Sequence, residues 1–183
     1  MSKVDLSKYK NTFSKKNQIK RLFWSIVWFF LAKPLPRSIG RKWKIFLLNT
    51  FGAKVHKTAN VYSSVKIYAP WNLEMHDFSC LAPEVDCYNV DRIIIGAHST
   101  VSQKSYLCTA SHDVCKSSNP LLTSPIIIKD QVWIGADVYL GMGITIEQGS
   151  VVGARSSVYK DVKPWEIIGG NPAKFIKKRK IIE

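Results

Sequence analysis

An aliphatic side chain recurs every six residues along most of this chain, and that period restricts the fold more than any other feature. Aliphatic residues fill fourteen of the fifteen slots that we assign, and only Ser79 departs from the rule. The slots are Val55, Val61, Ile67, Leu73, Ser79, Val85, Ile95, Val101, Leu107, Ile128, Ile134, Leu140, Ile146, Val152 and Val158. A period of six matches neither an α-helix nor a single alternating strand. The pattern therefore predicts a solenoid of short strands, each with one large side chain pointing inward.

The positive charge of the chain lies almost entirely in its N-terminal part. Residues 1–57 contain fourteen of the 27 basic residues and only one of the 13 acidic residues, Asp5. The net charge is therefore +13 for residues 1–57 and +1 for residues 58–183. A basic arm suits nucleic acid, anionic lipid or an anionic substrate. Because no nucleic-acid recognition motif is present, we expect no nucleic-acid partner.

An apolar run, Leu22–Ala32, lies inside this basic segment. Its eleven residues are too few for a membrane-spanning helix, which needs about twenty, and the residues that follow do not resemble a signal-peptide cleavage site. Two interpretations stay open: a helix buried against the domain or a neighbouring subunit, or a helix lying in the membrane interface. We expect a cytoplasmic protein, which under the second interpretation has peripheral contact with the inner face of the membrane.

The cysteines and histidines do not form a metal-binding pattern. Cys80, Cys87, Cys108 and Cys115 include no C-x-x-C pair, so we expect reduced thiols and no metal. A zinc hydrolyase built on a solenoid needs three converging histidines. The chain has no histidine after His112, which disfavours that class of enzyme.

Two long segments resemble a known superfamily. The run IIIKDQVWIGADVYLGMGITIEQGSVVGARSSVYKDV, followed by PWEIIGGNPAKFIKKR, resembles the hexapeptide-repeat acyltransferases. Within that superfamily, FGAKV, YAPWNLEM, VSQKSYLCTASHD and GGNPAK resemble the colanic-acid-type exopolysaccharide O-acetyltransferases, and the resemblance covers about residues 20–180. It implies a left-handed parallel β-helix with three strands per eighteen-residue turn. It also implies a homotrimer that holds acetyl-coenzyme A (acetyl-CoA) between neighbouring subunits.

We accordingly expect an all-β solenoid of about five turns, divided from the rest of the chain at recognisable positions. Residues 1–54 are predicted to form a basic, aromatic-rich helical segment, in which residues 41–51 carry apolar side chains at helical spacing. Residues 55–165 should form the β-helix, with a loop insertion at about residues 113–127. Residues 166–183 should form a basic tail with a short helix over residues 172–180.

Transfer of an acetyl group to a hydroxyl needs a general base, and histidine suits that role at neutral pH. His56, His76 and His98 lie inside repeats at positions that we expect to face solvent. His112 instead lies at the junction between a turn and the insertion. The resemblance places the catalytic histidine of sugar O-acetyltransferases at this junction, so we predict that His112 is the base.

Acceptor-binding residues are sought in the turn before His112. The resemblance to galactoside and maltose acetyltransferases would place an asparagine there, but Ala82 occupies that slot. Three nearby polar residues are the candidates for contact with acceptor hydroxyls, and Glu84 is preferred. These candidates are Glu84, Asp86 and Asn89.

The donor-binding residues are likewise implied by the resemblance. Trp133 should line the channel for the pantetheine arm, unless it simply packs on the outer face of the solenoid. Small residues should let the arm lie against the edge of the turns, and lysines should bind the phosphates. The small residues are Gly135, Ala136, Gly153 and Ala154, and the lysines are Lys160, Lys174 and Lys177.

The resulting prediction is an O-acetyltransferase that moves acetyl from acetyl-CoA directly to an acceptor hydroxyl within a ternary complex. The acceptor is expected to be a sugar, a polysaccharide precursor or a lipid-linked oligosaccharide. Two alternatives stay open at this point: an acetyltransferase for a small acceptor such as serine or an antibiotic, and a non-catalytic β-helical scaffold.

Overall fold

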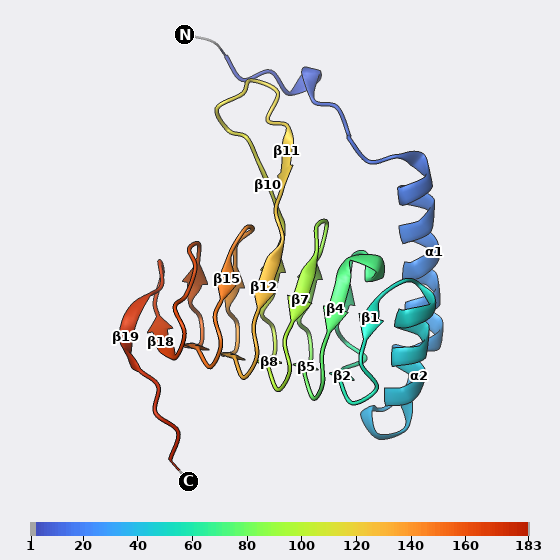
Figure 1. Cartoon of the computed structure of the whole chain (residues 1–183). Coiled ribbons are helices and arrows are strands. Elements are labelled where there is room, and N and C mark those ends of the chain that lie inside the picture. Colours follow the sequence, from blue (N-terminus) through green and yellow to red (C-terminus); the bar gives the residue numbers. More distant parts are fainter. Residues whose placement is uncertain (1–2, 183) are drawn as a thin grey trace.

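The chain forms a solenoid that two helices close at one end, and a single hairpin projects from its side (Figure 1). The structure is a computed structural model that describes residues 3–182, the side chains of residues 37–39 excepted. Its helices are α1 (Lys15–Leu31) and α2 (Arg37–Thr50), with short 3-10 helices η1 (Leu6–Lys8) and η2 (Pro70–Asn72).

Three sheets run along the solenoid, and each takes one strand from each of the first five turns. The first sheet contains β1 (Lys54–Val55), β4 (Leu73–Met75), β7 (Ile93–Ile95), β12 (Ile126–Ile128) and β15 (Thr145–Ile146). The second contains β2 (Asn60–Val61), β5 (Cys80–Leu81), β8 (Thr100–Val101), β13 (Trp133–Ile134), β16 (Val151–Val152), β18 (Glu166–Gly169) and β19 (Lys174–Lys178). The third contains β3 (Lys66–Ile67), β6 (Asp86–Tyr88), β9 (Tyr106–Cys108), β14 (Tyr139–Leu140) and β17 (Ser157–Val158). All neighbours in these sheets are parallel except β18 and β19, so the predicted parallel β-helix is confirmed.

The solenoid is slightly longer than predicted. The third sheet shows five complete turns, where about five were expected. A sixth turn begins at Val162, which bridges to Ile146, and continues with β18, which pairs with β16.

In the second turn, the large inward-pointing side chains are not the ones that the sequence register assigned. Met75, Leu81 and Cys87 occupy it, in register with the predicted slots Ile95, Val101 and Leu107. Ser79 is therefore not a broken slot but a small buried corner residue, equivalent to Ser99.

Turn length explains this error. Lys54 pairs with Glu74 and Glu74 with Ile94, so these turns take twenty residues, whereas Ile127 pairs with Thr145 eighteen residues later. The extra residues lie between the third and the first sheet, where the chain forms η2 in the first turn. Each of the first two turns therefore shifts the repeat by two residues. The register assigned from the sequence had placed both shifts together, as a single shift of four residues.

Helix α1 closes the open edge of the first turn. The Trp24 Nε1–H donates to the Ile67 carbonyl at 2.7 Å, and the Trp28 Nε1–H donates to the Val65 carbonyl at 3.1 Å. Both indoles are buried, and their donors satisfy carbonyls that no preceding turn can reach. The N-terminal helices are therefore the cap that a solenoid requires. No helix within residues 3–182 has the length and apolarity needed to cross a bilayer.

The predicted C-terminal helix is wrong, because this segment forms strand β19. It runs antiparallel to β18, with Gly169 opposite Lys174 and Glu166 opposite Lys178. As the last parallel strand, β18 needs partners for its outer edge, and Phe175 and Ile176 are good strand formers. The lysines of this segment favour a helix only weakly, so the sheet edge decides the conformation.

Candidate active site

His112 lies at the end of a two-stranded hairpin that leaves the solenoid between the third and the first sheet (Figure 1). The hairpin consists of β10 (Ala110–His112) and β11 (Leu121–Thr123), which pair antiparallel with His112 opposite Leu121. The predicted insertion is thus an ordered projection that begins two residues after β9. The imidazole is exposed at the end of β10 where the loop of the hairpin begins.

A backbone carbonyl inside the hairpin orients this imidazole. His112 Nδ1 lies 2.7 Å from the carbonyl oxygen of Asn119. A carbonyl oxygen only accepts, so Nδ1 must carry the proton and the lone pair of the neutral ring must lie on Nε2. Asn119 has a φ of 43°, in the left-handed region that asparagine tolerates. Asn119 was not predicted as a partner of His112, although the Asn119-Pro120 pair marks a turn.

The N-terminal segment also reaches the hairpin. The Asp5 N–H donates to the Ser117 carbonyl at 2.9 Å, and the rings of Tyr9 and His112 lie 6.0 Å apart. Residues so distant from His112 in the sequence carry no signal of this contact. The first residues of the described chain thus form one wall beside the candidate base.

The predicted acceptor residues lie apart from one another. Glu84 is exposed, with a φ of 60°, at the turn between the second and third sheets. Asp86 lies on the third sheet, where it pairs with Lys66 at 3.5 Å. Asn89 is fully buried, and its amide accepts from the Ala69 N–H and donates to the Ala69 carbonyl. The Asn89 side chain therefore serves the backbone in this arrangement and does not face an acceptor.

The predicted pantetheine residues do come together. Trp133 is 53% exposed on the second sheet, and its Nε1–H donates to Ser102 Oγ at 3.0 Å. The four small residues follow β13 and β16 at the next corner, in adjacent turns; they are Gly135, Ala136, Gly153 and Ala154. A Cβ on Gly135 would lie 2.7 Å from the Ala154 nitrogen, so stacking of the turns requires this glycine whatever it binds.

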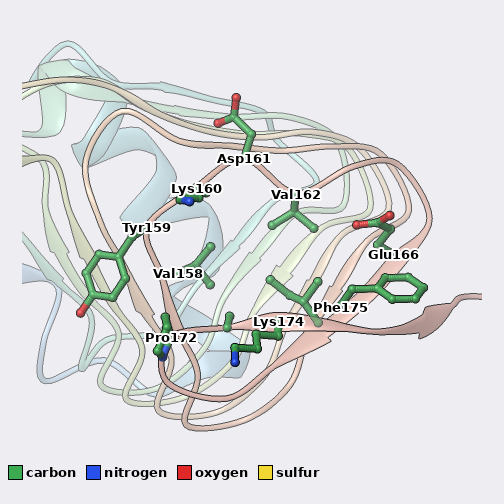
Figure 2. A pocket seen from close by; sticks show the side chains of 11 residues that line it. Val158, Tyr159, Lys160, Asp161, Val162, Glu166, Pro172, Lys174 and Phe175 are labelled. Carbon is green, nitrogen blue, oxygen red and sulfur yellow. The ribbon is translucent and has the colours of Figure 1, made fainter.

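Two of the three predicted lysines line one pocket of about 360 Å³ at the last turns of the solenoid (Figure 2). Lys160 follows β17, Lys174 begins β19, and Phe175 and Tyr159 form part of the wall. The third lysine, Lys177, lies farther along β19, is exposed, and is not among the residues that line the pocket.

The acids of this pocket are already engaged. Glu166 pairs with Lys178 at 3.1 Å, and Asp161 accepts from the Thr145 N–H at 2.7 Å. Within residues 3–182 neither Lys160 nor Lys174 has a carboxylate within ion-pair distance. The two ammonium groups therefore make the pocket suitable for an anion.

A row of tyrosines connects this pocket with the rest of the third sheet. The rings of Tyr106 and Tyr139 lie 5.8 Å apart, and those of Tyr139 and Tyr159 lie 5.6 Å apart. Burial raises the pKa of Tyr139 to about 12 and also raises the pKa of Tyr106. These phenols stay neutral near pH 7 and can offer hydroxyl groups as donors.

The base and the Trp133 surface lie on different sides of the solenoid. Trp133 belongs to the second sheet, whereas the hairpin of His112 leaves from the corner between the third and first sheets, opposite it. One chain therefore does not bring the two halves of the predicted site together. Residues 3–182 contain no cluster of three His, Cys, Asp or Glu side chains placed to hold a metal ion.

A three-sheeted solenoid of six-residue repeats, interrupted by a histidine-bearing hairpin, defines a β-helical acyltransferase. No protein-family model matches the chain. It is 42% identical over 163 residues to a protein of Escherichia coli K12 named as a colanic acid biosynthesis acetyltransferase, WcaF, and the match covers 89% of each chain. The chain therefore belongs to the hexapeptide-repeat acetyltransferases of the colanic-acid type.

Solved structures support the same assignment. A maltose O-acetyltransferase from Clostridium difficile is 26% identical, with a TM-score of 0.82 over 92% of this chain and 90% of that one. A hexapeptide-repeat acetyltransferase from Vibrio cholerae, complexed with acetyl coenzyme A, is 25% identical, with a TM-score of 0.82 over 94% of each chain. Both therefore match the present structure over at least 92% of this chain.

Proposed function

We propose that this protein transfers an acetyl group from acetyl-CoA to a hydroxyl of a sugar or polysaccharide precursor. Membership of the colanic-acid-type acetyltransferases supports the reaction, and the relative's match over 89% of both chains supports a saccharide acceptor. The observation that carries the proposal is the exposed His112, whose Nδ1 is bound to the Asn119 carbonyl and whose Nε2 is left to act as a base.

In the proposed mechanism, His112 Nε2 takes the proton of the acceptor hydroxyl as its oxygen attacks the thioester carbonyl. A C–O bond forms, the tetrahedral intermediate collapses, and the C–S bond breaks. The departing thiolate recovers the proton from the imidazolium, so the enzyme returns to its starting state. The Asn119 carbonyl would stabilise the imidazolium through the Nδ1–H bond throughout.

The donor would lie along the surface formed by Trp133 and the four small residues. Their grouping in adjacent turns supports this path for the pantetheine arm. The phosphates would be bound by Lys160 and Lys174 in their shared pocket, with Lys177 farther along the same strand. Lysine ammonium groups that line a pocket are the expected partners of a 3′-phosphate and a pyrophosphate.

We also propose that the protein is a homotrimer and that each site is completed by a neighbour. Separation of His112 from Trp133 on opposite sides of one solenoid supports this assembly. Glu84, which shares a corner with the small residues, would reach the acceptor from the neighbour, with Asp86 beside it on the third sheet. Asn89 is left out of the acceptor site because its amide is buried.

Each of the three parts of the chain would have its own role in the reaction. Residues 1–54 would close the solenoid and face the inner side of the membrane, residues 55–165 would carry the base and most of the donor surface, and residues 166–183 would complete the phosphate pocket. The reaction would take place in the cytoplasm, on a soluble or lipid-linked saccharide.

The direct test is replacement of the base. His112→Ala should lower kcat by roughly 10²–10⁴ while leaving the affinity for acetyl-CoA nearly unchanged, because the base acts only on the acceptor proton. Thiol release from acetyl-CoA, with acceptors selected from a panel of sugars, nucleotide-sugars and lipid-linked oligosaccharides, measures the effect. His98→Ala is the matched control, since His98 is exposed on the solenoid and stacks on Phe78. Retention of more than about a tenth of the turnover by His112→Ala would refute the assignment.

A further inference from the structure

Helix α1 has two apolar faces, and within residues 3–182 one of them stays largely exposed, although the Phe23 ring on that face lies 5.7 Å from the Phe51 ring. Trp24 and Trp28 face the solenoid, are buried, and bind the carbonyls of the first turn. On the other side lie six apolar residues at three- and four-residue intervals, between 46% and 68% exposed. These six residues, the outer face of α1, are Ile19, Leu22, Phe23, Ile26, Phe29 and Phe30.

A second exposed pair extends this surface onto α2. Trp43 and Phe46 stack with ring centroids 5.5 Å apart, and both are more than 40% exposed. The Trp43 Nε1–H donates to the Leu31 carbonyl at 2.8 Å, which places the pair at the C-terminal end of α1. Exposed apolar side chains gathered on neighbouring helices at one end of the chain mark a binding surface.

The segment of the chain that carries this surface has charge of one sign. No acidic residue occurs between Asp5 and Glu74, and fourteen Lys and Arg residues lie between them. Lys15 and Lys16 lie in the first turn of α1, and the Lys33 ammonium lies 5.2 Å from the Phe29 ring; the Lys20 ammonium instead lies 4.0 Å from the Trp71 ring of the solenoid. A second copy of this face would bring like charges together, so charge complementarity disfavours self-association here and favours an anionic partner.

We infer that the outer face of α1, with Trp43 and Phe46, binds the surface of an anionic lipid bilayer. The apolar side chains would enter the boundary between head groups and acyl chains, and the lysines would contact the phosphates. Trp24 and Trp28 stay bound to the solenoid, so binding needs no unfolding of the cap. This inference deepens the peripheral location included in the proposed function by naming the surface and the lipid.

The same geometry connects the bilayer with the candidate base. The segment before α1 passes Tyr68, whose ring lies 6.3 Å from that of Phe13, and reaches His112 through Tyr9. A saccharide attached to a membrane lipid would therefore lie near the entrance to the site. Peripheral binding through α1 would raise the local concentration of such an acceptor.

The test is flotation of the full-length protein with vesicles of phosphatidylglycerol and phosphatidylcholine in equal parts, and with pure phosphatidylcholine vesicles, at low and high salt. No acetyl donor or acceptor is added, so the result is independent of the acetyltransferase activity. We expect binding to the anionic vesicles that weakens with salt and is far weaker on pure phosphatidylcholine.

The double substitution Phe29→Ser and Phe30→Ser should reduce binding at least about tenfold, because it removes two rings from the bilayer contact. Phe78→Ser is the matched control, since Phe78 is 58% exposed on the solenoid away from α1. Circular dichroism and light scattering check that each variant keeps its fold and its subunit number.

Any of three flotation results would overturn the inference. They are absence of flotation with anionic vesicles at low salt, equal flotation of the Phe29/Phe30 variant, or equal binding to pure phosphatidylcholine. Loss of subunit assembly in the variant would also overturn it, since the face would then belong to a subunit interface. None of these results would affect the assignment of His112, which thiol release tests separately.

Discussion

Asn119 binds the His112 imidazole through its backbone carbonyl. The backbone conformation at position 119 depends in turn on which side chain is present there. Its carbonyl oxygen accepts from Nδ1 at 2.7 Å, and its φ is 43°. Asparagine and glycine adopt this left-handed region readily, whereas a β-branched residue is strained there. The residue at position 119 therefore controls the direction of the carbonyl and, through it, the orientation of the imidazole.

We predict that Asn119→Val lowers kcat about tenfold and leaves the KM for acetyl-CoA unchanged, since strain of about 1–3 kcal/mol would shift the carbonyl. Asn119→Gly keeps the conformation and should retain most of the activity, so it serves as the control. Steady-state kinetics of both variants decide the matter. Equal activity of the two would show that the carbonyl does not orient His112.

Single residues differ in how far a sequence can reveal them. The position of His112 beside the insertion could be predicted because the repeat pattern makes that junction visible, whereas its role as the base stays a prediction that rests on the family resemblance. Asn119 and Tyr9 could not, because a backbone carbonyl carries no residue-specific signal and Tyr9 meets His112 only in three dimensions. Asn89 was misjudged for the opposite reason: its polar side chain is used within the fold.

At the scale of elements, α1 is a cap whose two indole donors replace the missing turn. Trp24→Phe keeps an aromatic ring but leaves the Ile67 carbonyl without its donor. We predict a loss of about 1–3 kcal/mol in the free energy of unfolding, the usual cost of an unsatisfied buried group. Urea denaturation measures it, with Phe30→Ala as an exposed control expected within about 0.5 kcal/mol of the wild type. A loss for Trp24→Phe no larger than that of the control would contradict the capping role.

The pocket at the last turns of the solenoid takes Lys160 from the corner after β17 and Lys174 from the start of β19. We predict that Lys160→Ala and Lys174→Ala raise the KM for acetyl-CoA several-fold, and that Lys177→Ala has a smaller effect because it lies outside the pocket. Kinetics with acetyl-dephospho-CoA, which lacks the 3′-phosphate, provide the comparison. If the losses are the same with both donors, the lysines do not contact the 3′-phosphate.

Strands that belong to the six-residue repeat were predicted well. The C-terminal segment, whose conformation depends on pairing with the edge of a sheet, was predicted poorly. The six-residue repeat predicted the strands of the third, fourth and fifth turns in register, because each inward slot must be apolar in a stacked core. The sheet edge at β18 overrode the helical preference of the C-terminal lysines. The apolar run at Leu22–Ala32 had suggested either packing against the domain or contact with lipid. In the structure, α1 has one buried face that packs on the solenoid and one exposed apolar face.

For the whole molecule, the central question is how two distant surfaces can serve one reaction. The hairpin that carries His112 projects from one corner of the triangular solenoid, and Trp133 lies on the sheet opposite that corner. A ring of identical subunits in head-to-tail contact brings the corner of one chain to the sheet of the next, and three such contacts close a trimer. Each site would then need His112 from one subunit and Trp133 from its neighbour.

This arrangement predicts complementation between two defective variants. His112→Ala lacks the base, and Trp133→Ala should bind acetyl-CoA poorly, so each alone should be nearly inactive at limiting donor. Co-expressed in equal amounts, they should form mixed trimers in which about a quarter of the sites combine an intact His112 with an intact Trp133. Thiol release should recover to about a quarter of the wild-type rate, and light scattering should give the mass of a trimer. If both residues instead served a site within one chain, every site would keep one defect, and the mixture would show only the sum of the two residual activities.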